Sequence, residues 1–236
     1  MPVRVHLLSA KFLPDITTTL TEKDVGRIFW KANRIWEPAG VQFYIESLVK
    51  ESAAHQEHQS QLFNFGDHYA LESLRPVESQ SKKMFHIYYV KTMQMNGICF
   101  PESIFVKDTA KLRAVARGLD EPLPRVTAHE LGHGLGLDHR QNLTNLMASG
   151  TTGFLLNEQE VERARAMARK IPWIETAPNI LKKADELFQC KKAGEARILY
   201  GRLMGIPLND REVEVAKQRW RSISAPLVSS SPKMRR

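Results

Sequence analysis

The sequence contains few cysteines and no long apolar run. Cys99 and Cys190 are the two cysteines among 236 residues, and they lie far apart in segments of different type, which excludes a disulfide framework and fits a reducing compartment. No run of eighteen apolar residues occurs, so a membrane-spanning helix of ordinary length is excluded. The first residues enter a strand-like pattern without the apolar core of a signal peptide. We therefore expect a cytoplasmic protein, with leaderless export as the open alternative.

Acidic and aromatic residues are also scarce. The chain has 34 Lys and Arg against 26 Asp and Glu, a formal charge of +8, which favours acidic polypeptides, anionic surfaces or nucleic acid as partners. Aromatic residues make up 8% of the chain, and none interleave with a basic run in a recognised nucleic-acid motif. We interpret the excess of basic residues as a solvated basic face. We expect a polypeptide as the partner rather than nucleic acid, and acidic polypeptides are favoured. The oligomeric state stays open.

One eleven-residue segment carries the strongest chemical signal. Residues 129–139 read His-Glu-Leu-Gly-His-Gly-Leu-Gly-Leu-Asp-His, an HExxHxxGxxH pattern. Side chains four apart share one face of a helix, so His129 and His133 can reach a single metal ion while Glu130 projects about 100° away. Histidine accounts for 8 of the 236 residues, and a chance match to the whole pattern is on the order of one in ten thousand or rarer. The pattern predicts a zinc site in which Glu130 is free to act as a base.

A third ligand requires the motif helix to stop and the chain to reverse. Gly136 is placed to end the helix, because only glycine adopts a positive φ cheaply. His139 then lies just past the bend. The segment thus offers three imidazoles to one ion.

The residues after the motif extend the pattern. Met147 follows His139 by eight residues and lies in a short segment bounded by Asn142, Gly150 and Gly153. In these features the sequence resembles the metzincin clan of zinc peptidases, in which a tight turn places a methionine beneath the zinc-bound histidines. The resemblance implies Glu130 as general base and Met147 as the turn residue, although an ordinary apolar side chain remains the alternative for Met147. It implies three Zn²⁺ ligands: His129, His133 and His139.

Strand signals recur through the first half of the chain. Alternating or dense β-branched and aromatic residues predict five strands, at 3–8, 41–49, 85–90, 98–100 and 103–106. The polar stretch from Lys50 to Lys83 predicts a surface excursion that contains a short helix at 69–74.

Helical spacing accounts for most of the remainder. It predicts a long helix after a Thr21–Asp24 capping box, the motif helix at 124–137, and a helix capped by Asn157 and stopped by Pro172. Further on, the spacing predicts two more elements: a helical hairpin at 181–204 that breaks near Gly194, and a helix at 213–220.

The order of these elements resembles the metzincin catalytic domain. We therefore expect an α+β, zincin-like fold with a twisted, mixed five-stranded sheet, an active-site helix and a C-terminal helical extension. Residues 1–172 would form the catalytic domain, 173–223 the helical extension, and 224–236 a disordered tail. By the same resemblance, residues 97–100 form the edge strand to which an extended peptide pairs.

Two residues near the expected site have competing interpretations. Asp138 is the rival third ligand, but His139 fits the spacing better and leaves Asp138 a supporting or structural role. Cys99 borders the expected cleft and could coordinate zinc as an inhibitory thiolate, although a small buried apolar side chain is favoured.

The remaining histidines have simpler interpretations. His55 and His58 are three apart in a polar loop, where solvated histidines are more common than a second metal site. His6, His68 and His86 are interpreted as structural.

The resemblance implies a zinc-dependent metalloendopeptidase, which hydrolyses peptide bonds with zinc-activated water and with Glu130 as general base. The alternative is a non-catalytic module that keeps zinc for stability and binds peptides or nucleic acid through its basic surface. The free carboxylate of Glu130 favours the enzyme, because a structural zinc site normally fills its fourth coordination position with protein.

Overall fold

The structure is a computed structural model that describes residues 1–56, 69–80, 83–115, 121–150, 153–204 and 211–224. It divides into two compact units, Met1–Ile174 and Glu175–Arg236. The boundary predicted from the sequence lies after residue 172. The predicted disordered tail lies, from residue 225 on, outside the described residues.

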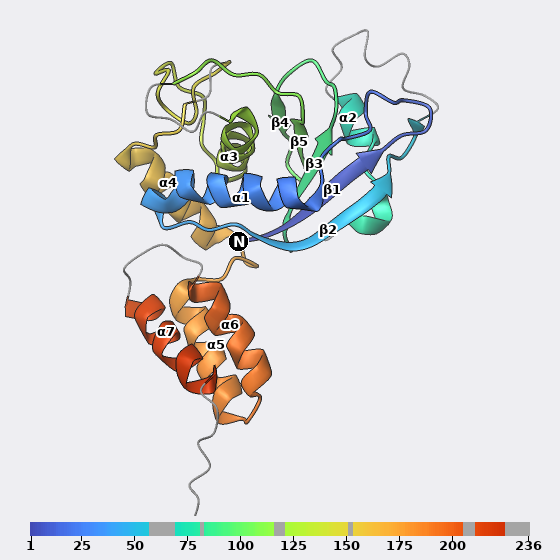
Figure 1. Cartoon of the computed structure of the whole chain (residues 1–236). Helices are drawn as coiled ribbons and strands as arrows, with labels where there is room; N and C mark the ends of the chain where they lie inside the picture. Colours follow the sequence, from blue (N-terminus) through green and yellow to red (C-terminus); the bar gives the residue numbers. More distant parts are fainter. Residues whose placement is uncertain (57–68, 81–82, 116–120, 151–152, 205–210, 225–236) are drawn as a thin grey trace, which may run out of the picture. The chain divides into compact units, whose positions relative to one another are not determined.

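A five-stranded sheet forms the centre of the first unit (Figure 1). Along the sheet the order is β2-β1-β3-β5-β4, and neighbours are parallel except for β4, which is antiparallel to β5. The predicted mixed sheet is therefore confirmed, with β4 at one edge. The strand bounds are β1 Pro2–Ser9, β2 Tyr44–Ser52, β3 Phe85–Val90, β4 Gly97–Cys99 and β5 Ile104–Lys107.

Both faces of the central strands are buried. Val3 and Val5 of β1 belong to the larger apolar cluster, which also contains side chains of α1 (Glu22–Trp36) and α3 (Pro122–Gly134). Leu8 belongs to a second cluster, with Leu71 of the short helix α2 (Tyr69–Ser73). Side chains alternate across a strand, so a strand buried on both faces must be apolar almost throughout.

The start of β2 differs from the sequence prediction. Val41 and Phe43 are buried as the alternation suggested, but the strand begins only at Tyr44. The side chain of Asn33 donates to the carbonyl of Phe43 and accepts from its N–H, both at 2.8 Å. The backbone of Phe43 is thus satisfied by a side chain of α1 instead of by the sheet.

The helices of the first unit begin and end at recognisable signals. The Thr21–Asp24 capping box starts α1, as predicted. A 3₁₀ turn, η1 (Glu37–Ala39), follows it and ends at Gly40, which has a φ of 62°. Asn157 and Glu160 form a second capping box, at the start of α4 (Glu158–Lys170). The described part of this unit also contains the 3₁₀ turn η3 (Val77–Ser79).

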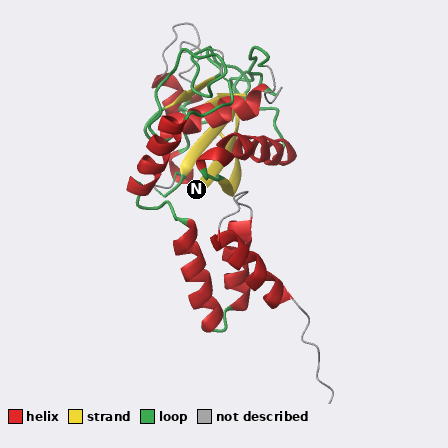
Figure 2. Ribbon diagram, turned by 90° about the vertical axis from the view of Figure 1, so that its left-hand side faces the viewer, coloured by secondary structure: helices red, strands yellow, loops and turns green. Residues whose placement is uncertain are grey.

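The second unit contains the helices α5 (Ala177–Gln189), α6 (Ala193–Met204) and α7 (Arg211–Ser224), and strands are drawn only in the first unit (Figure 2). Its apolar cluster joins Ala184, Tyr200 and Ala216, one from each helix. The predicted hairpin at 181–204 is confirmed, with its break at residues 190–192, close to Gly194: the chain reverses at Lys191, whose φ is 59°, and Gly194 lies inside α6.

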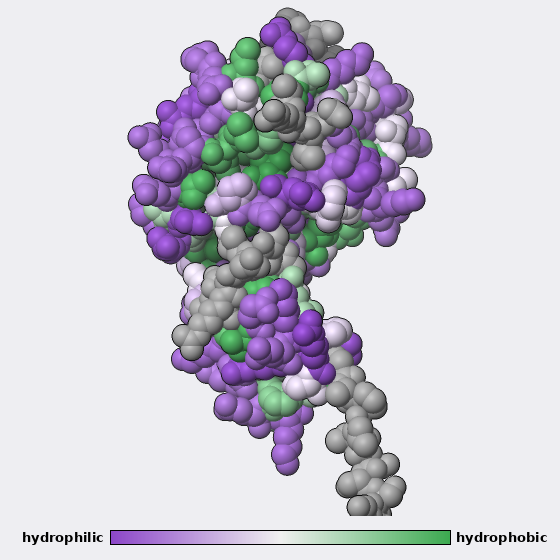
Figure 3. Space-filling view, turned by 60° about the vertical axis from the view of Figure 1, so that its left-hand side comes forward, coloured by the Kyte–Doolittle hydropathy of each residue, from purple (hydrophilic) through white to green (hydrophobic). Residues whose placement is uncertain are grey.

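Hydrophilic side chains cover much of the face of the first unit drawn in Figure 3 and surround a hydrophobic area. Among the described residues, no helix combines the length and the apolar character that a membrane crossing requires.

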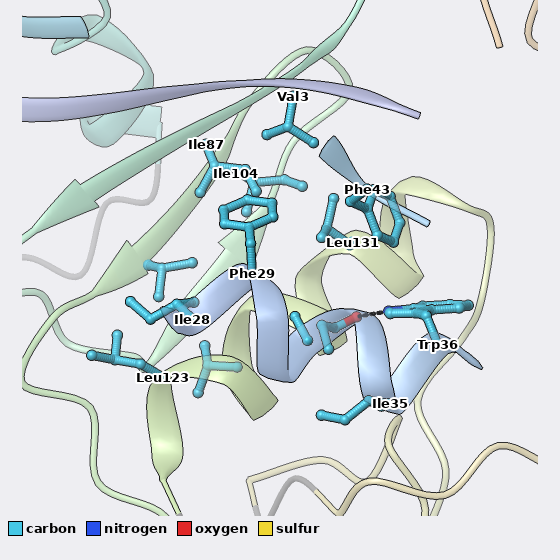
Figure 4. Packing of buried hydrophobic residues seen from close by; sticks show 14 of the residues in the cluster. Val3, Ile28, Phe29, Ile35, Trp36, Phe43, Ile87, Ile104, Leu123 and Leu131 are labelled. Atoms are coloured by element: carbon cyan, nitrogen blue, oxygen red, sulfur yellow. Dashed lines mark hydrogen bonds between the residues drawn. The ribbon is translucent and has the colours of Figure 1, made fainter. Parts of the chain in front are cut away.

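Trp36 joins α1 to the motif helix. Its side chain is fully buried, and its indole N–H donates to the carbonyl of Ala128 on α3 at 3.2 Å (Figure 4). Trp30 lies on the same helix but is 60% exposed. The two tryptophans therefore differ in environment and not in chemistry.

We expect Trp36→Phe to lower the free energy of unfolding by about 2 kcal/mol, because it removes a buried hydrogen bond and leaves a gap in the core. Trp30→Phe, the matched control, should change it by less than about 0.5 kcal/mol. Urea unfolding measures both variants, and equal effects would contradict this account of the α1–α3 contact.

Candidate metal centre

The end of α3 reverses the chain toward the motif histidines. The helix was predicted to reach Leu137 but ends at Gly134. Gly136 has a φ of +76°; its N–H donates to the carbonyl of His133 at 2.8 Å, and the N–H of Leu137 donates to that of Gly132 at 2.9 Å. These two bonds form a Schellman motif, which satisfies the last carbonyls of the helix and redirects the chain.

Three imidazoles meet where the chain returns. The Nε2 atoms of His129 and His133 are 3.1 Å apart, those of His133 and His139 are 3.2 Å apart, and those of His129 and His139 are 3.3 Å apart. Among the described residues, these histidines make up the one group of three or more His, Cys, Asp or Glu side chains that could hold a metal ion.

The hydrogen bonds of two rings fix which nitrogen faces the centre. Nδ1 of His129 is 2.7 Å from the carbonyl of Leu146, and Nδ1 of His133 is 2.8 Å from that of Leu137. A carbonyl only accepts, so each Nδ1 carries the proton and each Nε2 presents a lone pair. Two lone pairs at this distance repel each other unless a cation lies between them.

The spacing suits a tetrahedral ion. Metal–nitrogen bonds of about 2.0–2.1 Å in tetrahedral geometry place two nitrogens about 3.3–3.4 Å apart, and the three observed separations are 3.1–3.3 Å. Burial lowers the pKa of His129 to about 4 and also lowers the pKa of His133. Both rings are therefore neutral near pH 7, which is the form that binds metal.

Glu130 lies beside the three imidazoles but is not one of the group. Its side chain is buried, and burial raises its pKa to about 8. A hollow of about 640 Å³ is lined by Glu130, His133 and His139 together with Gly97 and Cys99. A nearby dication would stabilise the carboxylate and lower this pKa again.

Gly97 allows Glu130 to lie against the edge strand. A Cβ atom on Gly97 would come within 2.5 Å of Oε1 of Glu130 and within 2.7 Å of its Cγ. From the sequence, Gly97 is predicted only to belong to a turn and to the edge strand. Its steric role was missed, because it depends on the approach of Glu130, which lies more than thirty residues further along the chain.

Met147 lies under the turn of α3 that carries the histidines. It is fully buried, and a Cβ on Gly132 would come within 2.6 Å of its sulfur. Gly132 stands between His129 and His133 in the sequence. A glycine inside a helix costs about 1 kcal/mol relative to alanine and so signals a packing reason, which here is the methionine sulfur.

Neither of the two rival candidates belongs to the group of three histidines. Asp138 is exposed, and its carboxylate pairs with Arg163 at 2.6 Å. Burial, with a further contribution from Glu130, raises the pKa of the Cys99 thiol to about 12. Cys99 therefore stays protonated beside the hollow.

The other histidines are divided between surface, core and undescribed segments. His55 is exposed, and His58 and His68 lie outside the described residues. His6 and His86 are buried, with Nε2 of His6 2.8 Å from Nδ1 of His86, while Nδ1 of His6 contacts Glu51. This pair supports the structural interpretation of both residues.

No family model and no curated relative matches the chain. Among solved structures, archaemetzincin from Methanopyrus kandleri gives a TM-score of 0.45 at 14% identity, over 72% of this chain and 96% of its own. Metalloproteinase-II from Bacteroides fragilis gives 0.40 at 14% identity, over 70% of this chain and 53% of its own. A zinc-dependent peptidase from Methanocorpusculum labreanum gives 0.30 at 13% identity, over 69% and 98%. These scores are too low to transfer a function.

The contact between Gly132 and Met147 can be tested by stability alone. Gly132→Ala should lower the free energy of unfolding by about 1–3 kcal/mol, because the new methyl group overpacks the methionine. Gly26→Ala on α1 is the matched control: no atom lies within 4 Å of its added Cβ, so the helix should gain up to about 1 kcal/mol. Urea unfolding that gave both variants the same sign would contradict the contact.

Proposed function

We propose that the first unit is a zinc metalloendopeptidase of the metzincin type, in which His129, His133 and His139 hold the ion and Glu130 is the general base. The observation that carries the proposal is the convergence of three Nε2 atoms, next to a hollow that is lined by His133, His139 and the buried carboxylate of Glu130. Three imidazole ligands leave a fourth position of a tetrahedral ion to water or substrate, which is typical of catalytic zinc sites and not of structural ones.

The proposed chemistry divides between the ion and one side chain. Zinc held by three neutral imidazoles would supply Lewis acidity, which would lower the pKa of water toward about 7 and polarise a carbonyl group. A carboxylate oxygen of Glu130 takes the proton of the water that attacks the peptide carbonyl carbon. Glu130 then returns this proton to the nitrogen of the departing amine. Burial against Gly97 restricts where the carboxylate can lie and so favours one geometry for both transfers.

The edge strand supports a polypeptide substrate. β4 pairs with β5 on one side and is the last strand of the sheet, and its residues Gly97 and Cys99 line the same hollow as Glu130. An extended peptide that paired with β4 would present its backbone to the three histidines, whatever its side chains. The net charge of +8 favours acidic peptides among these.

The position of Met147 supports the metzincin assignment over a general zinc hydrolase. The resemblance implies a turn methionine beneath the histidines, and the buried sulfur of Met147, packed against Gly132 between His129 and His133 in the sequence, supports that placement. His139 and Met147 then belong to one loop, so the third ligand and the supporting methionine are positioned together.

Glu130→Ala is expected to keep one zinc ion per chain and to lose peptide hydrolysis by a factor of about 10² to 10⁴, because only the proton acceptor is removed. Glu158→Ala, an exposed carboxylate on α4, is the control and should keep full activity. Zinc content and cleavage of a mixed peptide library measure the two effects.

An unchanged rate in Glu130→Ala would refute the proposed role. Cleavage by the unaltered protein should also stop with a chelator and return with zinc. Stoichiometric zinc and peptide binding without any cleavage would favour the non-catalytic module instead.

Gly97→Ala should lower kcat at least tenfold with zinc content unchanged, because the new Cβ displaces the Glu130 carboxylate and not the histidines. Gly26→Ala again serves as the control for replacing glycine by alanine. A Gly97→Ala variant with normal kcat would show that the position of the carboxylate against β4 does not matter for the reaction.

A further inference from the structure

Glu160 is a buried carboxylate outside the metal centre whose oxygens are all engaged. Glu160 is 2% exposed. Oε1 accepts from Nε of Arg140 at 3.1 Å, and Oε2 accepts from Nδ2 of Asn145 at 2.7 Å and from the N–H of Asn157 at 2.9 Å. A buried carboxylate is costly unless such partners satisfy it, so its presence requires a reason.

Only one of the three contacts is local. The bond from Asn157 completes the capping box of α4, which a glutamate at this helix position makes in many proteins. The bonds from Arg140 and Asn145 reach another segment, the loop between His139 and Met147. Capping alone does not require that the carboxylate be buried against this loop.

The two loop contacts lie at the points that shape the metal centre. Arg140 directly follows His139, and its N–H donates to the carbonyl of Met147 at 2.8 Å. Oδ1 of Asn145 accepts from the N–H of Met147 at 2.7 Å. Asn145 also precedes Leu146, whose carbonyl faces Nδ1 of His129. One carboxylate thus holds both ends of the loop that supplies an imidazole and orients another.

The carboxylate attaches this loop to a well-packed helix. Ala164 and Ala168 of α4 lie in the main apolar cluster. The core therefore holds the helix from which Glu160 projects. The loop has its own cross-connection, since the N–H of Ser149 donates to the carbonyl of Arg140 at 3.2 Å. The loop is therefore cross-connected within itself, and Glu160 connects it to α4.

We propose that Glu160 is a positioning residue for the metal centre, which sets His139 and the Leu146 carbonyl so that the three imidazoles converge. This inference rests on the proposed function, because it assumes that the histidines bind zinc. Replacing a hydrogen-bond partner behind a ligand typically costs 10- to 100-fold in metal affinity. We expect an effect of that size although Glu160 does not touch the ion.

Glu160→Gln tests this with no change of volume. In either orientation, the amide NH₂ faces the N–H donor of Arg140 or those of Asn145 and Asn157, so at least one bond is lost. Arg140→Met removes the same contact from a side chain that is 43% exposed, and it serves if Glu160→Gln folds poorly. Glu158→Gln, an exposed position two residues earlier on α4, is the matched control.

The measurements are zinc affinity by chelator competition, the visible spectrum of the Co²⁺-substituted protein, and the Tm of the metal-free protein. Glu160→Gln and Arg140→Met should bind zinc 10- to 100-fold more weakly and alter the Co²⁺ spectrum, while Glu158→Gln matches the unaltered protein. A lower Tm with unchanged zinc affinity and Co²⁺ spectrum would reduce Glu160 to a structural residue and overturn the proposal.

His139→Ala separates this inference from the proposed function. If His139→Ala weakens zinc binding but Glu160→Gln and Arg140→Met do not, only the role of Glu160 is wrong. If the unaltered protein does not bind zinc, or if His139→Ala binds it equally well, the proposed function is wrong and the inference falls with it.

Discussion

Two imidazole nitrogens that point their lone pairs at each other repel unless a cation lies between them, and the first unit is arranged around such a contact. The rings of His129 and His133 hold this orientation because each donates Nδ1–H to a backbone carbonyl, that of Leu146 or Leu137. Both carbonyls belong to the chain that follows α3. The helix alone therefore does not orient its own ligands, and the return of the chain after Gly136 is as necessary as the spacing of the histidines.

Close approach around this contact depends on residues without side chains. Gly132 admits the sulfur of Met147 beneath the helix, and Gly97 admits the carboxylate of Glu130 beside the edge strand. An alanine at either position would place a carbon closer to these groups than van der Waals contact allows and force one of them to move. The groups around the histidines can therefore pack closely, because α3 and β4 each have a glycine at the point of contact.

The sequence predicted the features that depend on nearby residues and missed those that depend on tertiary contacts. The motif, both capping boxes, the five strands and the reversal at Gly136 each depend on neighbours within a few residues, so their patterns could be read directly. The start of β2 could not be predicted in this way, because Asn33 of a separate helix makes the hydrogen bonds of the Phe43 backbone. The hairpin break is predicted only to within a few residues, because Gly194 tolerates a positive φ best and yet Lys191 is the residue that adopts it. Gly97 and Glu160 acquire their meaning only from segments distant in sequence.

The two capping boxes have the same local pattern, but their carboxylates lie in different environments. In α1, Asp24 closes the box with Thr21, whose hydrogen bonds lower the pKa of Asp24 to about 2, and it pairs with Arg27 of the same helix at 3.0 Å. In α4, Glu160 closes the same kind of box but is buried, and its other partners belong to the loop after His139. If capping were the whole purpose, the partly exposed arrangement of Asp24 would serve at lower desolvation cost. The burial of Glu160 is therefore better explained by the loop that it holds than by the helix that it begins.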